Sequence, residues 1–243
     1  MFEQYYDNDD DKNNEEVRCD KETVQRLYKI LIIGDPGTGK SSIIRQFVQN
    51  TYTQHYKATV GVDFATKILM YDDGTLLRLQ LWDVSGQDRF SNLTRVYFKD
   101  AHGAIVVTDC LRKDTLEGGL KWKNDLDNKI RLADGNLIPT ICVANKCDVK
   151  KDLDEEEFNK FAKENNFCKG MICSAKENIA IENIFRELSK VILETDKQGL
   201  YEIPAYLRDS NTYRLSDLSS EVYQRIDKKN TKSHGFIKSF CCQ

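Results

Sequence analysis

The sequence lacks any run of about 18 consecutive apolar residues, which is the minimum for a helix that spans a bilayer. Residues 1–26 also lack the apolar core of a secretory signal peptide. We therefore expect any membrane attachment of this chain to be peripheral or covalent.

The patterns of cysteine and histidine that hold zinc are also missing. The 8 cysteines include no Cys-x-x-Cys pair, and the 3 histidines are scattered, so we predict reduced cytosolic thiols and no zinc site. An excess of charge is absent too, because 36 basic and 39 acidic residues give a net charge of −3. This balance does not favour nucleic acid as a partner.

Composition divides the chain into three parts. Residues 1–26 are rich in Asp, Asn and Glu, which predicts a disordered acidic extension, and we favour a solvated segment over a partner-binding one. Residues 27–195 carry the apolar periodicity of one folded domain. Residues 196–243 are expected to form a flexible, polar tail, in which a short helix over 215–226 is left open.

The folded part alternates strand patterns with helix patterns. The turn Asp72-Asp73-Gly74 joins two strands as a hairpin, whereas helices separate the other strands. This alternation predicts an α/β fold with a mostly parallel six-stranded sheet, one antiparallel edge strand and helices on both faces. We expect strands at 28–33, 62–71, 76–83, 104–108, 139–144 and 171–173, and helices at 40–50, 114–132, 154–165 and 181–193.

A phosphate-binding loop follows the first predicted strand. Residues 34–41 fit the pattern G-x-x-x-x-G-K-S between a buried strand and a helix. Backbone N–H groups of such a loop surround phosphates, the lysine reaches the β- and γ-phosphates, and the serine hydroxyl is a Mg²⁺ ligand. The predicted phosphate contacts are Asp35, Pro36, Gly37, Thr38, Gly39, Lys40, Ser41 and Ser42. This loop alone predicts a nucleoside triphosphate, because ATPases, kinases and GTPases share it.

Two later loops indicate which base is bound. Asn145-Lys146-Cys147-Asp148 and Ser174-Ala175-Lys176 each follow a predicted strand. The carboxylate of Asp148 can accept two hydrogen bonds from N1–H and the exocyclic amine of guanine. Adenine lacks both donors and leaves that charge unpaired, so GTP is predicted and an adenine-using ATPase is the remote alternative.

These motifs, in this order, make the chain resemble a Ras-superfamily GTPase over essentially all of residues 27–193. The resemblance implies that Asn145 joins the nucleotide loops, Lys146 lies over the base, and the Ala175 N–H faces guanine O6. Tyr52 is implied to contact another edge of the base. The wider nucleotide-binding set that the resemblance implies also contains Tyr56, Thr59, Gly86, Ser174 and Lys176.

The stretch Asp83-Val84-Ser85-Gly86-Gln87 resembles the D-x-x-G-Q motif of that family. By this match Asp83, Ser41 and Thr59 hold Mg²⁺, Gly86 N–H meets the γ-phosphate, and Gln87 is the catalytic residue that orients the attacking water. Loss of the γ-phosphate then lets the flanking loops relax.

Three residues depart from the family pattern near the reaction centre, namely Pro36, Ser85 and Asp88. They imply slow hydrolysis that depends on a GTPase-activating protein. Pro36 and Ser85 also leave open an alternative function, a GTP-binding membrane scaffold that hydrolyses poorly.

Within the superfamily the chain resembles the Rab branch. The segments Gly61-Val62-Asp63-Phe64, Leu79-Gln80-Leu81-Trp82-Asp83 and Asp88-Arg89-Phe90 are Rab-like, and His55-Tyr56-Lys57-Ala58-Thr59 is most similar to the Rabs numbered thirty-two and thirty-eight. This implies vesicle trafficking at lysosome-related organelles or phagosomes. The partners implied are an exchange factor, a GTPase-activating protein, a GDP-dissociation inhibitor and effectors.

The last residues, Cys241-Cys242-Gln243, resemble a Rab tail that carries a geranylgeranyl group on each cysteine. Two such chains give stable anchoring where one is marginal. Phe2 is not glycine, which excludes N-myristoylation. Five basic residues could add attraction to anionic lipid at about 1 kcal/mol each, namely Arg225, Lys228, Lys229, Lys232 and Lys238.

Overall fold

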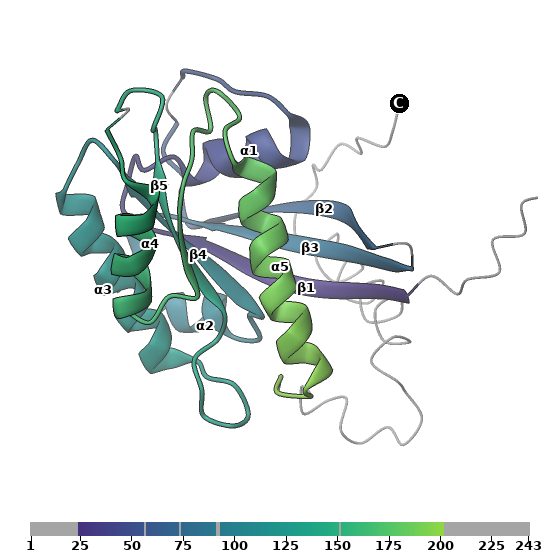
Figure 1. The fold of residues 1–243 in the computed structure, drawn as a ribbon. Coiled ribbons are helices and arrows are strands. Elements are labelled where there is room, and N and C mark those ends of the chain that lie inside the picture. Colours follow the sequence, from purple (N-terminus) through teal and green to yellow (C-terminus); the bar gives the residue numbers. More distant parts are fainter. Residues whose placement is uncertain (1–23, 56, 73, 91–92, 151, 202–243) are drawn as a thin grey trace, which may run out of the picture.

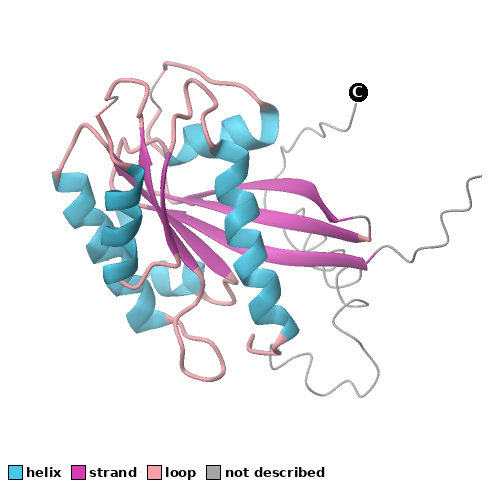
Figure 2. Ribbon diagram, in the orientation of Figure 1, coloured by secondary structure: helices cyan, strands magenta, loops and turns pink. Residues whose placement is uncertain are grey.

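In the computed structural model, residues 24–201 are described except 56, 73, 91, 92 and 151. They form one six-stranded sheet flanked by helices, as Figures 1 and 2 show. Residues 1–23 of the predicted extension, the possible helix at 215–226 and the basic residues of the tail lie outside the described residues, as does Tyr56.

The sheet has the order β2-β3-β1-β4-β5-β6, and only the edge strand β2 runs antiparallel to its neighbour. The predicted fold class and the hairpin between β2 and β3 are thereby confirmed. The strands are β1 (Val24–Ile33), β2 (Val62–Asp72), β3 (Thr75–Val84), β4 (Gly103–Asp109), β5 (Thr140–Asn145) and β6 (Lys169–Ile172).

Helices cover both faces of this sheet. On one face α1 (Lys40–Gln49) and α5 (Ile181–Lys197) pack with the apolar side chains of a common core, in which the rings of Phe47 and Phe185 stack at 3.8 Å. The other face is covered by α2 (Thr94–Phe98), α3 (Asp114–Lys129) and α4 (Glu155–Glu164), with Trp122 of α3 fully buried. None of the helices in the described ranges has the length and apolar character needed to cross a bilayer.

Several boundaries differ from those predicted. Strand β1 begins at Val24, so the folded domain starts before the predicted boundary at residue 27, because Val24 to Arg26 pair with β3. Helix α5 runs to Lys197, beyond the predicted domain end at 195. A short 3-10 helix η1 (Asp88–Phe90) and helix α2 were not predicted, and α3 ends at Lys129 because Ile130 is extended.

Contacts near residue 201 hold the end of the described chain against the sheet. The Tyr201 hydroxyl donates a hydrogen bond to the carbonyl oxygen of His102 at 2.8 Å. The Tyr28 hydroxyl and the Arg26 guanidinium both donate to Asp196 Oδ2, at 2.7 and 3.0 Å. Burial lowers the pKa of His102 to about 4, with a smaller opposing effect from Asp196. This cluster fixes the end of α5 beside the amino ends of the parallel strands.

Candidate nucleotide-binding site

The phosphate loop connects β1 to α1 at the carboxyl edge of the sheet. Its backbone has φ of 75° at Gly37 and 96° at Gly39, a region that glycine enters without steric cost. A Cβ at position 39 would also lie 2.3 Å from Nδ2 of Asn145, so glycine is needed there for packing as well. The loop is therefore held tightly against the strand end of β5.

Lys40, the first residue of α1, lies across the inside of this loop. Its Nζ donates hydrogen bonds to the carbonyl oxygens of Gly34 at 2.8 Å and Asp35 at 3.0 Å. Burial lowers the pKa of Lys40 to about 8, while Asp83 and Asp35 act in the opposite direction. The group therefore carries a positive charge at neutral pH in a place where phosphate oxygens would meet it.

Oxygen atoms from three elements meet beside Lys40. Ser41 Oγ donates to Asp83 Oδ2, and Thr59 Oγ1 lies 3.1 Å from Ser41 Oγ and 3.4 Å from Asp83 Oδ2. The second carboxylate oxygen, Asp83 Oδ1, is buried and has no hydrogen-bond partner among the described residues. Burial raises the pKa of Asp83. Two hydroxyls and an unpartnered carboxylate oxygen are the hard donors that Mg²⁺ takes, so these residues fit that ion.

Asn145, at the end of β5, joins the phosphate loop to the loop after β6. Its Nδ2 donates to the carbonyl oxygen of Thr38 at 2.9 Å, and its Oδ1 accepts from the Ala175 N–H at 3.1 Å. All three residues are buried. The arrangement gives Asn145 the connecting position that the sequence implied.

Asp148 lies in the loop after β5, where it meets the loop after β6. Its Oδ1 accepts a hydrogen bond from the Ser174 hydroxyl at 2.6 Å, and Lys176 Nζ is 3.9 Å from its Oδ2. Ser174 Oγ in turn accepts from the Glu177 N–H at 3.0 Å. These contacts hold the carboxylate of Asp148 in one orientation at the edge of the site.

Sequence reasoning missed a buried carboxylate, Asp109, at the end of β4. Its Oδ2 accepts from Lys146 Nζ at 2.7 Å and from Arg112 Nε at 3.2 Å. Lys146 also donates to the Gly37 carbonyl at 2.9 Å, and Arg112 to the Pro36 carbonyl at 2.9 Å. Burial acts to raise the pKa of Asp109, but hydrogen bonds, chiefly from Lys146, outweigh it and lower the pKa. The signal in the sequence was an acidic residue at the end of a short strand that is apolar over residues 104–107.

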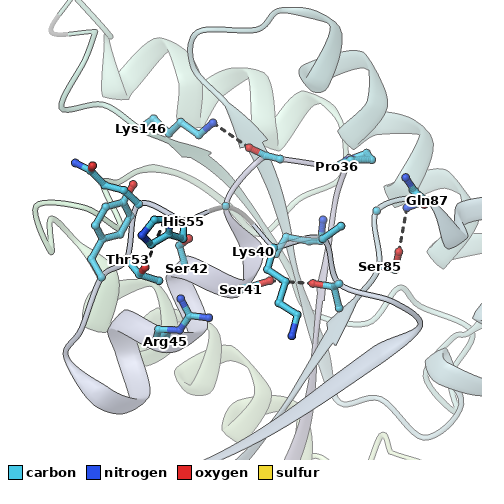
Figure 3. A pocket seen from close by; sticks show the side chains of 18 residues that line it. Pro36, Lys40, Ser41, Ser42, Arg45, Thr53, His55, Ser85, Gln87 and Lys146 are labelled. Carbon is cyan, nitrogen blue, oxygen red and sulfur yellow. Dashed lines mark hydrogen bonds between the residues drawn. The ribbon is translucent and has the colours of Figure 1, made fainter.

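A pocket opens between the phosphate loop and residues 52–59, as Figure 3 shows. Among its described lining residues are four cationic side chains, Lys40, Arg45, Lys57 and Lys146, and no carboxylate. Such a lining attracts a polyanion. The sequence-predicted residues that line the pocket are Pro36, Gly37, Gly39, Lys40, Ser41, Ser42, Tyr52, Thr59, Gly86, Gln87 and Lys146.

Other predicted residues lie around the pocket without forming its wall. Thr38 lies within the phosphate loop, and Asn145 donates a hydrogen bond to its carbonyl oxygen. The adjoining loops described above contain Asp148, Ser174, Ala175 and Lys176. The side chain of Asp35 turns toward α3, where it accepts from Trp122 Nε1 at 3.2 Å. Cys241 and Cys242 lie outside the described residues.

Comparison with known proteins agrees with this geometry. Residues 29–194 match the model of the Ras family. The chain is 44% identical over 223 residues to the Ras-related protein Rab-32 of Sus scrofa, covering 91% of each chain. It is 51% identical to Rab-32 of Homo sapiens over 71% of this chain and 77% of the relative. It is also 38% identical to Rab-7L1 of Homo sapiens over 72% of this chain and 91% of the relative.

The family match spans every loop of the site and all of the sheet except residues 24–28 of β1, and the identities extend over most of each relative. Members of this family hydrolyse GTP, use Mg²⁺ with it, and act at intracellular membranes with regulators and effectors. The chain is a GTP-hydrolysing small GTPase of the Ras family and belongs to the Rab branch that contains Rab-32 and Rab-38.

Proposed function

We propose that this protein is a GTP-dependent switch that recruits effectors to lysosome-related organelles or phagosomes. The observation that carries the proposal is the cluster of Ser41, Thr59 and the unpartnered Asp83 Oδ1 beside the buried ammonium of Lys40. A buried charge and a buried, unpaired oxygen both cost free energy in the absence of a partner. Mg²⁺ with a triphosphate supplies partners for both.

In this proposal Lys40 and the N–H groups of the phosphate loop bind the β- and γ-phosphates. Ser41, Thr59 and Asp83 would hold Mg²⁺, which when bound would supply positive charge against the phosphates. Gly86 N–H meets the γ-phosphate. Thr59 and Gly86 belong to separate loops, and the γ-phosphate with its Mg²⁺ would contact both, so loss of the phosphate removes a contact from each loop and lets them relax.

Guanine selection is assigned to Asp148, whose carboxylate is already oriented by Ser174. Calorimetry with Mg²⁺ should show GTP and GDP binding far more tightly than ATP. Asp148→Asn exchanges a carboxylate for an amide of the same shape, and it should reduce the preference for GTP by a factor of about 100 or more. Asp154→Asn is a matched control, because Asp154 caps α4 outside the pocket. Equal binding of ATP and GTP by the unaltered protein would refute the assignment.

Hydrolysis is assigned to water held by Gln87, which lines the pocket beside Gly86. Gln87→Leu keeps an uncharged side chain of somewhat shorter reach but removes both polar atoms, so single-turnover hydrolysis should fall while nucleotide binding is retained. An unchanged rate would count against this role of Gln87.

A second candidate function is a GTP-binding scaffold with little intrinsic hydrolysis. It is favoured by Pro36 and Ser85, which depart from the family pattern close to Gly86 and Gln87. The nitrogen of Pro36 carries no hydrogen, so position 36 cannot donate a backbone hydrogen bond toward the reaction centre. Incubation of the protein with GTP for hours, with and without an activating protein, distinguishes the two functions.

Membrane attachment is assigned to geranylgeranyl groups on Cys241 and Cys242, supported by the resemblance of the last residues to a Rab tail. Protein prenylated in vitro should sediment with liposomes. The variant with both cysteines changed to serine should remain in the supernatant, and sedimentation of that variant would refute the assignment.

A further inference from the structure

The side chain of Asp35 makes its contacts outside the nucleotide pocket. Although it belongs to the phosphate loop, its Oδ1 accepts a hydrogen bond from Trp122 Nε1 of α3 at 3.2 Å. Trp122 is fully buried, so its N–H needs this acceptor. The carboxylate fits against α3 only because residue 118 is glycine, since a Cβ there would lie 1.8 Å from Asp35 Oδ2.

The same carboxylate oxygen also faces an arginine from a third element. Arg89 of η1 places its guanidinium nitrogen 3.6 Å from Asp35 Oδ1. The two side chains are largely shielded, with exposed fractions of 16% for Arg89 and 23% for Asp35. Helix η1 begins at Asp88, immediately after Gln87.

Asp35 is itself firmly held. Its carbonyl oxygen accepts from Lys40 Nζ at 3.0 Å and from Thr38 Oγ1 at 3.0 Å, and its side chain is fixed by Trp122. Arg89 is therefore attached to a rigid reference point made of the phosphate loop and α3. Only Asp88 separates Arg89 from Gln87, so the ion pair holds the chain close to the glutamine, next to the contacts that Ser85 makes with the N–H groups of Gln87 and Asp88.

We propose that Asp35 is a positioning residue for hydrolysis, which holds Gln87 beside the γ-phosphate through Arg89. The proposal rests on the role assigned to Gln87 above. It extends that role by giving a phosphate-loop carboxylate a function in hydrolysis that is separate from nucleotide binding.

The test compares single-turnover GTP hydrolysis with the dissociation rate of GDP. Asp35→Asn keeps an oxygen that accepts from Trp122 but removes the charge that attracts Arg89. Hydrolysis should slow about five-fold, the effect of a partly shielded ion pair, while GDP dissociation stays within about two-fold of the unaltered protein. Glu187→Gln is the control, because it removes a carboxylate of an α5 ion pair with Lys169 outside the pocket.

A double-mutant cycle separates positioning from a general loss of stability. Arg89→Gln should slow hydrolysis by a similar factor, and the combination with Asp35→Asn should be no slower than either alone. In a Gln87→Leu background, Asp35→Asn should have no further effect. Thermal unfolding measured by tryptophan fluorescence checks that each variant is folded. If Asp35→Asn is not folded, the hydrolysis rate of Arg89→Gln is used to test the proposal.

Additive losses in the cycle, or a further loss in the Gln87→Leu background, would overturn the proposal. It would also be overturned if Asp35→Asn hydrolyses GTP at the normal rate while Gln87→Leu does not, and the proposed function would then stand. If the unaltered protein fails to hydrolyse GTP even with an activating protein, both are overturned.

Discussion

Asn145→Ala is the most direct test of how the loops of the site depend on one another. The substitution removes the amide that donates to the Thr38 carbonyl at 2.9 Å and accepts from the Ala175 N–H at 3.1 Å. Because Thr38 and Ala175 are buried, water does not replace the lost partner easily. Each buried group left without a hydrogen bond costs about 1 to 3 kcal/mol.

Two such groups should destabilise the conformation in which both loops are ordered by about 3 kcal/mol. If nucleotide binds only that arrangement, the affinity for GDP falls by about a hundredfold, since 1.4 kcal/mol corresponds to a factor of ten. Asn145→Asp should lose at least as much, because its second oxygen faces the Thr38 carbonyl in place of a donor.

The assay is displacement of a fluorescent GDP analogue, measured beside thermal unfolding. Asn159→Ala is the matched control, because Asn159 of α4 accepts from the Gly170 N–H at 3.0 Å outside the pocket. That variant should lose stability but keep its affinity. An affinity of Asn145→Ala within about three-fold of the unaltered protein would refute the reasoning, since it would mean that the two orphaned groups cost less than about 1 kcal/mol.

Two further substitutions test groups that the sequence did not single out. Asp109→Asn keeps the shape of the side chain but removes the charge that Lys146 and Arg112 share. Because both cations are partly solvated, we expect the binding free energy of GDP to weaken by about 1 kcal/mol. In a stopped-flow measurement, GDP should then be released about five-fold faster. The low pKa of His102, about 4 against an ordinary 6.5, means that the folded state resists protonation, so stability is lost as pH falls from about 6.5 to 4. The free energy of unfolding falls by at most about 3 kcal/mol through this group. His102→Asn keeps an acceptor for the Lys29 N–H and should remove that part of the pH dependence, as measured by denaturant titrations.

The strands of the core could be predicted because burial on both faces requires continuous apolar runs. Residues 30–33 of β1 and all of β4 are buried, and the sequence shows this directly. The first residues of β1 could not be predicted in this way. Val24, Gln25 and Arg26 are partly exposed, and their strand conformation comes from pairing with β3, which is distant in sequence.

Short elements fixed by tertiary contacts were also missed. Helix α2 has only five residues, too few to display a helical period, and it is held by the buried Phe98 and by a hydrogen bond from Lys129 Nζ to Thr94 Oγ1 at 2.6 Å. Such contacts depend on the final placement of α3. The local sequence therefore does not predict them.

Some residues of the site could likewise be predicted from local sequence, whereas others depend on tertiary contacts. The phosphate loop and the loop at Asn145 were predicted because each has a fixed spacing of residue types. Asp109, Arg112 and the outward-facing carboxylate of Asp35 act through partners far away in the chain, namely Lys146, Pro36 and Trp122. Their roles become visible only once the strands are aligned.

The hydrogen bond from Tyr201 to His102 fixes the end of the described chain at one edge of the folded domain. His102 precedes β4, at the amino ends of the parallel strands, whereas the residues that line the nucleotide pocket follow the carboxyl ends of β1 and β3. The last described residue therefore lies at the edge opposite the nucleotide pocket. With lipid at its far end, the protein would turn its pocket toward the cytosol, where nucleotide and soluble regulators can reach it without crossing the membrane surface.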